Sequence, residues 1–79
     1  MTDSIDRLSV WAVRYALGRR TYAVEDVVQT LIAERARLSE KSRVVIIRDI
    51  TEAEAAGNLG MDFDARAWFR LRDALMEKP

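Results

Sequence analysis

The sequence predicts an all-α fold, a compact single-domain bundle of about four helices over residues 1–79. A chain of 79 residues has room for one hydrophobic core and therefore one domain. Apolar residues recur at helical spacing in four segments, and no two segments alternate as paired strands would. The three glycines fall between these segments, and the single proline is the last residue. All three observations favour short helices joined by tight connections.

The first predicted helix runs from about Ser4 to Leu17 and is apolar on two sides. One side carries Ile5, Leu8, Ala12 and Ala16, and the other carries Val10, Val13 and Leu17. Gly18 follows as a helix-ending residue in the left-handed conformation. Four short helices cannot easily cover both sides of this helix. We therefore expect a homodimer that uses Val10, Trp11, Val13 and Leu17.

The second predicted helix begins after Thr21, its expected N-cap. Its apolar residues fit one helix face without a gap: Val24, Val27, Val28, Leu31 and Ile32. Arg35 and Arg37 follow at the other end, where cations suit the negative end of the helix dipole.

The third segment is ambiguous, because residues 44–47 are four β-branched residues that favour a strand. No second β-rich run exists to pair with them. Ser39 is a good N-cap, and Gly57 is placed to end a helix of about residues 40–56. We interpret the segment as a helix whose inner face is Ile46, Ile47, Ile50 and Ala53.

The fourth predicted helix begins at Asp64 or Asp62 as N-cap. Its apolar stripe is Trp68, Phe69, Leu71, Leu75 and Met76. Arg72 falls in the middle of that stripe. An arginine in this position must extend to solvent along its stem or pair with a carboxylate.

The residue types argue against catalysis and against a cofactor. The chain has no cysteine and no histidine, so thiolate chemistry is excluded and the commonest general base and metal ligand are absent. Asp62 and Asp64 alone do not form a calcium loop, and we interpret them as helix caps. No uncharged run approaches the ~20 residues of a membrane span. An acidic start, unlike a basic secretory signal, leads us to expect a cytoplasmic protein.

The net charge is zero, but charges of one sign are grouped along the chain. Residues 49–64 contain five acidic residues and no basic one. This segment is either a solvated helix face with its loop or a surface that meets a basic groove. The pI of about 6.2 and the acidic stretch after each basic one disfavour direct nucleic-acid binding. A small nucleic-acid-binding regulator remains the alternative.

A set of residues spread over nearly the whole chain forms a recognisable pattern. It comprises Arg14-Tyr15-Ala16-Leu17-Gly18-Arg19, Thr21-Tyr22, Ile47-Arg48-Asp49-Ile50, Leu59-Gly60, Asp64 and Trp68. In this pattern the chain resembles a family of small phage- and prophage-encoded proteins, some of which inhibit type I CRISPR systems. The resemblance implies a host-cytoplasmic anti-CRISPR-like inhibitor that binds a type I Cascade subunit and blocks target-DNA binding. A phage accessory protein that only oligomerises is a further alternative.

Two sets of charged residues are candidates for the contact with such a complex. A surface that competes with DNA for a basic track should offer carboxylates. The acidic candidates are Glu52, Glu54, Asp62 and Asp64, and the rival basic pair is Arg19 and Arg20.

Other residues of the pattern are expected to be structural. Gly18 and Thr21 would form the corner between the first two helices. Arg14 and Asp49 are lone charges on apolar stretches, so we expect them to form an inward ion pair, whose rupture would cost several kcal/mol.

Overall fold

The computed structural model describes residues 4–17 and 22–77, and within them every regular element is a helix. The elements are α1 (Ser4–Ala16), α2 (Tyr22–Ala33), a 3-10 turn (Arg35–Arg37), α3 (Glu40–Ala55) and α4 (Asp62–Met76). The all-α single-domain prediction is confirmed. The radius of gyration is 11.5 Å, and a compact domain of this length should have about 11.6 Å. Gly18, Arg19, Arg20 and Thr21 lie outside the described residues.

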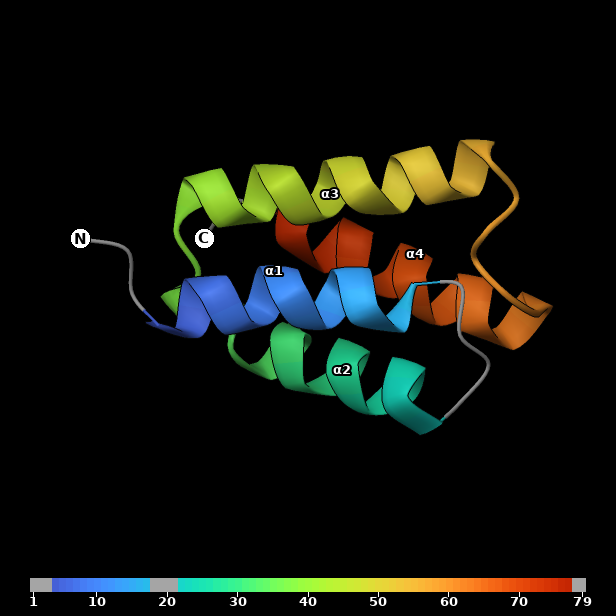
Figure 1. Ribbon diagram of the computed structural model, residues 1–79. Helices are drawn as coiled ribbons and strands as arrows, with labels where there is room; N and C mark the ends of the chain where they lie inside the picture. Colours follow the sequence, from blue (N-terminus) through green and yellow to red (C-terminus); the bar gives the residue numbers. More distant parts are fainter. Residues whose placement is uncertain (1–3, 18–21, 78–79) are drawn as a thin grey trace.

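The four helices form a bundle in which α1 and α4 are diagonal to each other. Each of them packs against both α2 and α3. Figure 1 shows α1 in front of α4, with α3 above and α2 below. α1 and α3 run in one direction, and α2 and α4 run in the other. The outward side of α1 is therefore not covered by a fifth element of the described chain.

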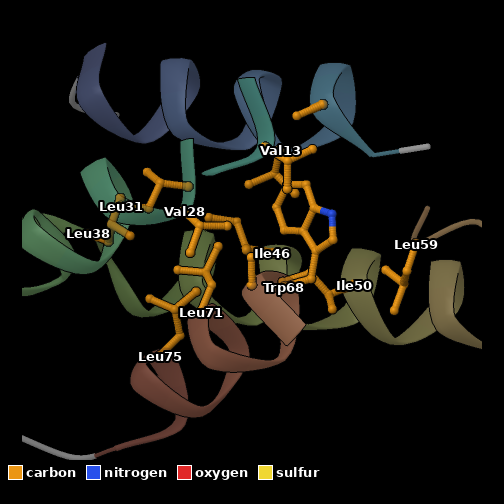
Figure 2. Packing of buried hydrophobic residues seen from close by; sticks show 13 residues of the cluster. Val13, Val28, Leu31, Leu38, Ile46, Ile50, Leu59, Trp68, Leu71 and Leu75 are labelled. Carbon is orange, nitrogen blue, oxygen red and sulfur yellow. The ribbon is translucent and has the colours of Figure 1, made fainter. Parts of the chain in front are cut away.

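The core is built around Trp68, which comes from α4 and is fully buried (Figure 2). Every helix contributes to this cluster. Its largest fully buried apolar side chains besides Trp68 are Ile46, Ile50, Leu71, Val13, Val24 and Val28. The indole nitrogen of Trp68 is buried and has no hydrogen-bond partner among the described residues.

The predictions for α3 are confirmed at both ends. The Ser39 hydroxyl accepts a hydrogen bond from the Ser42 N–H (3.2 Å), as an N-cap does. Gly57 has a φ of +73°. Its N–H donates to the Glu54 carbonyl, and the Asn58 N–H donates to the Ala53 carbonyl, which is the Schellman pattern. The β-branched run is helical because no other segment offers it a strand.

The start of α4 differs from the prediction. Its N-cap is Met61, and Asp62 and Asp64 lie inside the first turn. The buried Asp64 carboxylate accepts a hydrogen bond from the Met61 N–H at 3.4 Å, which is one half of a capping box. Asp64 therefore satisfies the helix start from position N3. Met76, expected in the apolar stripe, is exposed at the last turn of α4.

The faces of α1 also differ from the prediction. Val13 and Ala16 are fully buried, whereas Leu8, expected on the same side as Ala16, is exposed. Val13 faces the core and cannot contribute to a dimer contact. Of the four residues expected in that contact, Val10 and Leu17 are half-buried and only Trp11 is largely exposed.

Candidate protein-binding surface

The outward side of α1 carries three large apolar side chains in a row. Leu8, Trp11 and Tyr15 are 65%, 62% and 50% exposed. Their spacing of three and four residues places them on one helix face. The rings of Trp11 and Tyr15 stack, with centroids 5.0 Å apart and planes 16° apart. We name these three residues the α1 ridge.

Arginines flank the ridge. Arg7 and Arg14 are exposed on α1. The Arg14 Nε donates to Asp49 Oδ2 on α3 at 2.9 Å, so the predicted ion pair exists. The Arg14 side chain is 58% exposed and the Asp49 side chain 13%. The expectation of an inward, buried pair is therefore wrong. It joins α1 to α3 at the protein surface.

The ion pair shows at which level α1 and α3 meet. α1 and α3 run in the same direction (Figure 1), so Arg7 lies about two turns before the level of Asp49. Lys41 and Arg48 are exposed on α3. Glu52 is an exposed carboxylate on the same helix.

The four acidic residues predicted to bind a partner are not equivalent. Glu52 and Asp62 are exposed. Glu54 accepts a hydrogen bond from Arg72 Nη1 at 2.9 Å, and Asp64 is buried at the start of α4. Two of the four carboxylates therefore already have partners within the protein, Glu54 in a surface pair with Arg72 and Asp64 at the buried start of α4.

The structure confirms that Arg72, within the apolar stripe of α4, pairs with a carboxylate. Besides Glu54, its guanidinium reaches the Thr51 hydroxyl at 3.2 Å, and it lies 4.9 Å from the centre of the Phe69 ring. These contacts tie α4 to α3 across the apolar stripe. The arginine is thus structural.

Two shallow grooves flank the C-terminal half of α4. One of about 620 Å³ lies between α3 and α4, and Val44, Ile47 and Met76 line part of it. The other, of about 560 Å³, lies between α2 and α4. The charged residues that line the first groove are Glu40, Arg43 and Glu77, and those of the second are Arg35, Arg66, Arg70, Asp73 and Glu77.

Other kinds of site receive no support from the described residues. No group of three acidic side chains is placed to hold a metal ion within residues 4–17 and 22–77. No helix in the same ranges is long and apolar enough to cross a bilayer.

Sequence reasoning placed Trp11 in an expected homodimer contact but did not anticipate that Leu8 and Tyr15 are exposed beside it. A signal was present, since Arg7 and Arg14 are two turns apart and mark one side of α1 as solvent-facing. Trp11 lies midway between them, and Leu8 and Tyr15 are its neighbours on the helix surface. Counting apolar residues alone placed Leu8 on the same side of the helix as Ala16.

Comparisons of this chain with known protein families, with characterised proteins and with solved structures find no match.

Proposed function

We propose that this protein acts by binding another protein through the α1 ridge, and that it neither catalyses a reaction nor reads nucleic acid. The partner that the sequence resemblance implies is a type I CRISPR surveillance complex. In that role the protein would be an anti-CRISPR-like inhibitor that prevents the complex from binding target DNA.

The observation that carries the proposal is the exposure of Trp11 beside Tyr15 and Leu8. Contiguous exposed apolar surface on a small protein marks an interaction site. Tryptophan and tyrosine supply much of the binding energy at protein interfaces. α1 already holds its place through Val13 and Ala16, which are buried, so the ridge is not required for packing.

The ridge supports this function better than the acidic residues do. Only Glu52 and Asp62 of the four remain exposed and outside internal contacts. Isolated exposed charges contribute little binding energy, whereas buried aromatic residues dominate it. We therefore propose the ridge as the surface that contacts the partner. Glu52 and Asp62 remain the alternative contact surface.

The test uses a purified type I surveillance complex and measures its binding to target DNA. The ridge variant Trp11→Ser/Tyr15→Ser should lose inhibition by at least tenfold. The acidic variant Glu52→Lys/Asp62→Lys should inhibit as the unchanged protein does. Circular dichroism must show the same helix content for all three.

The opposite pattern, with inhibition lost only in the acidic variant, would assign the contact to Glu52 and Asp62. If the unchanged protein leaves target binding unaffected at saturating concentration, the inhibitor function is wrong. A gel shift with random duplex DNA at low salt tests the nucleic-acid alternative, and we expect no shift.

A further inference from the structure

We propose that α1 undocks from the bundle as a unit while α2, α3 and α4 stay folded together. The helix that carries the ridge then has a docked and an undocked state. The inference goes beyond the proposed function and does not depend on what the ridge binds. It rests on how unequally the buried core and the polar links between helices are shared among the four helices.

The inner face of α1 buries small side chains. Among residues 7–17, the members of the buried cluster are Val13 and Ala16. Ser9, one turn before Val13 on the same face, is buried too, so this face is partly polar. The rest of the chain contributes larger side chains to the cluster, among them Leu31, Ile46, Ile50, Trp68, Leu71 and Leu75. Because hydrophobic stabilisation grows with the apolar area removed from water, these residues hold α2, α3 and α4 together more firmly than α1 is held.

The polar links between helices favour α4 in the same way. Arg70 of α4 pairs with Glu25 of α2, with Nη2 and Oε1 2.7 Å apart. Arg72 of α4 pairs with a carboxylate of α3. From α3, the Arg43 guanidinium donates to two carbonyls at the end of α4, at 2.9 and 3.0 Å. α4 is therefore linked to both of its neighbours.

The described ion pair of α1 is a weaker link. It joins Arg14 to Asp49 of α3, and most of the Arg14 side chain is exposed. Exposed ion pairs contribute little to stability. No ion pair joins α1 to α2 within residues 4–17 and 22–77.

The arrangement of the helices allows α1 to leave alone. α1 and α4 each pack against α2 and α3, from opposite sides (Figure 1). Undocking of α1 therefore leaves the contacts of α4 with α2 and α3 in place. Proteins open locally where few apolar contacts are buried and local stability is low, and α1 is the helix that meets this condition.

Undocking matters for the proposed binding surface. The ridge is the outward face of the helix that moves, so a partner that binds docked α1 stabilises the docked state. A ligand shifts a conformational equilibrium toward the form that it binds more tightly. Binding at the ridge and docking of α1 are therefore coupled, although undocking itself needs no partner.

Native-state hydrogen exchange of the full chain, followed by NMR without a partner, tests the inference. Amide protection factors for residues 11–16 of α1 should be at least ~10-fold lower than those for residues 67–71 of α4. Exchange in α1 should also respond less to added urea, because undocking exposes less surface than global unfolding does.

Two truncations distinguish undocking from global unfolding. Leu75 is buried on the side of the cluster away from α1 (Figure 2), so its contacts persist when α1 undocks. Leu75→Ala should therefore speed exchange in α4 and leave exchange in α1 unchanged. Val13→Ala is the matched variant on α1. It destabilises the docked state relative to both the undocked and the unfolded state, so it should speed exchange in both helices by the same factor.

Circular dichroism checks that both variants fold. If Leu75→Ala does not fold, Leu75→Val removes less volume and should show the same selective effect on α4 at a smaller size.

Three results would overturn the inference. Equal protection of α1 and α4 in the unchanged protein would mean that the four helices open together. The same would follow if the Leu75 variant sped exchange in α1 as much as in α4. A gradual rise in protection from residue 11 to residue 16 would indicate that α1 frays from its start instead of undocking as a unit. None of these measurements uses the surveillance complex, so the inference and the proposed function are tested separately.

Discussion

The two tryptophans of this protein lie on diagonal helices and in opposite environments. Trp68 on α4 is fully buried at the centre of the bundle (Figure 2), and Trp11 on α1 is mostly exposed beside Tyr15. α4 is held by Asp64 at its start, by Arg72 along its length and by Arg43 at its end. The outward face of α1 has one described ion pair, from Arg14 to Asp49. Residues of one type thus stabilise the fold in one region and remain available for binding in the other.

The largest expected effect is the difference between truncating the two tryptophans. Trp68→Ala removes the central core side chain and should cost about 3–5 kcal/mol. Trp11→Ala removes an exposed ring and should cost less than ~1 kcal/mol. Urea unfolding followed by circular dichroism measures both. Equal losses would mean that Trp11 is a packing residue and would break the comparison.

Trp68→Phe sharpens this result and guards against a variant that does not fold. Phenylalanine fills part of the site and removes the buried indole N–H that lacks a described partner. An unsatisfied buried donor costs about 1–3 kcal/mol, so the loss should be clearly smaller than that of Trp68→Ala. A loss as large as that of alanine would indicate that the indole nitrogen has a partner.

The next effect concerns the loop that leads into α4. Gly57 and Gly60 both have positive φ, +73° and +87°. A Cβ on Gly57 would meet nothing within 4 Å, whereas a Cβ on Gly60 would lie 3.0 Å from Asp64 Oδ2. Gly57→Ala should cost about 1–2 kcal/mol for its backbone conformation alone. Gly60→Ala should cost more, because it also displaces the carboxylate that caps α4.

The same urea unfolding assay compares these two glycine variants. Equal losses would show that the Asp64 contact does not contribute to the stability of α4. In that case Asp64 would not stabilise the start of α4, and α4 and α1 would differ less in how they are held than the two tryptophans suggest.

The smallest effect is expected for the ion pair that joins α1 to α3. Because most of the Arg14 side chain is exposed, Asp49→Ala should cost less than ~1 kcal/mol. This expected loss is smaller than the several kcal/mol that the rupture of a buried pair would cost. A measured loss above ~3 kcal/mol would show that the pair is desolvated and that α1 is held to α3 mainly by charge.

The fold could be predicted from the sequence because local signals agree with the core. Ser39 and Gly57 bound α3, and the inner face of α3 was correct to the residue at Ile46 and Ile50. The start of α4 was misplaced because an acidic residue can serve a helix from N3 as well as from the N-cap position. Only the observed Met61–Asp64 contact distinguishes the two.

The candidate site was less predictable because exposure depends on how the helices are arranged. α1 has apolar residues on two sides, and the spacing of these apolar residues alone does not say which side α2 and α3 cover. The structure shows that Val13 and Ala16 face inward and that Leu8 and Tyr15 face outward. The chemistry of the charges was equally hidden, since the pairing of Arg72 with Glu54 and the burial of Asp64 are tertiary contacts.

Hydroxyl-radical footprinting of this protein, alone and with a purified type I surveillance complex at saturation, tests the central claim most directly. The account predicts that the complex protects Leu8, Trp11 and Tyr15 from oxidation. Phe63 and Met76 are exposed on α4 and serve as internal controls, so their oxidation should not change. Protection of Phe63 or Met76 with Trp11 still fully reactive would contradict the α1 ridge as the binding surface, and protection of none of them would contradict the partner.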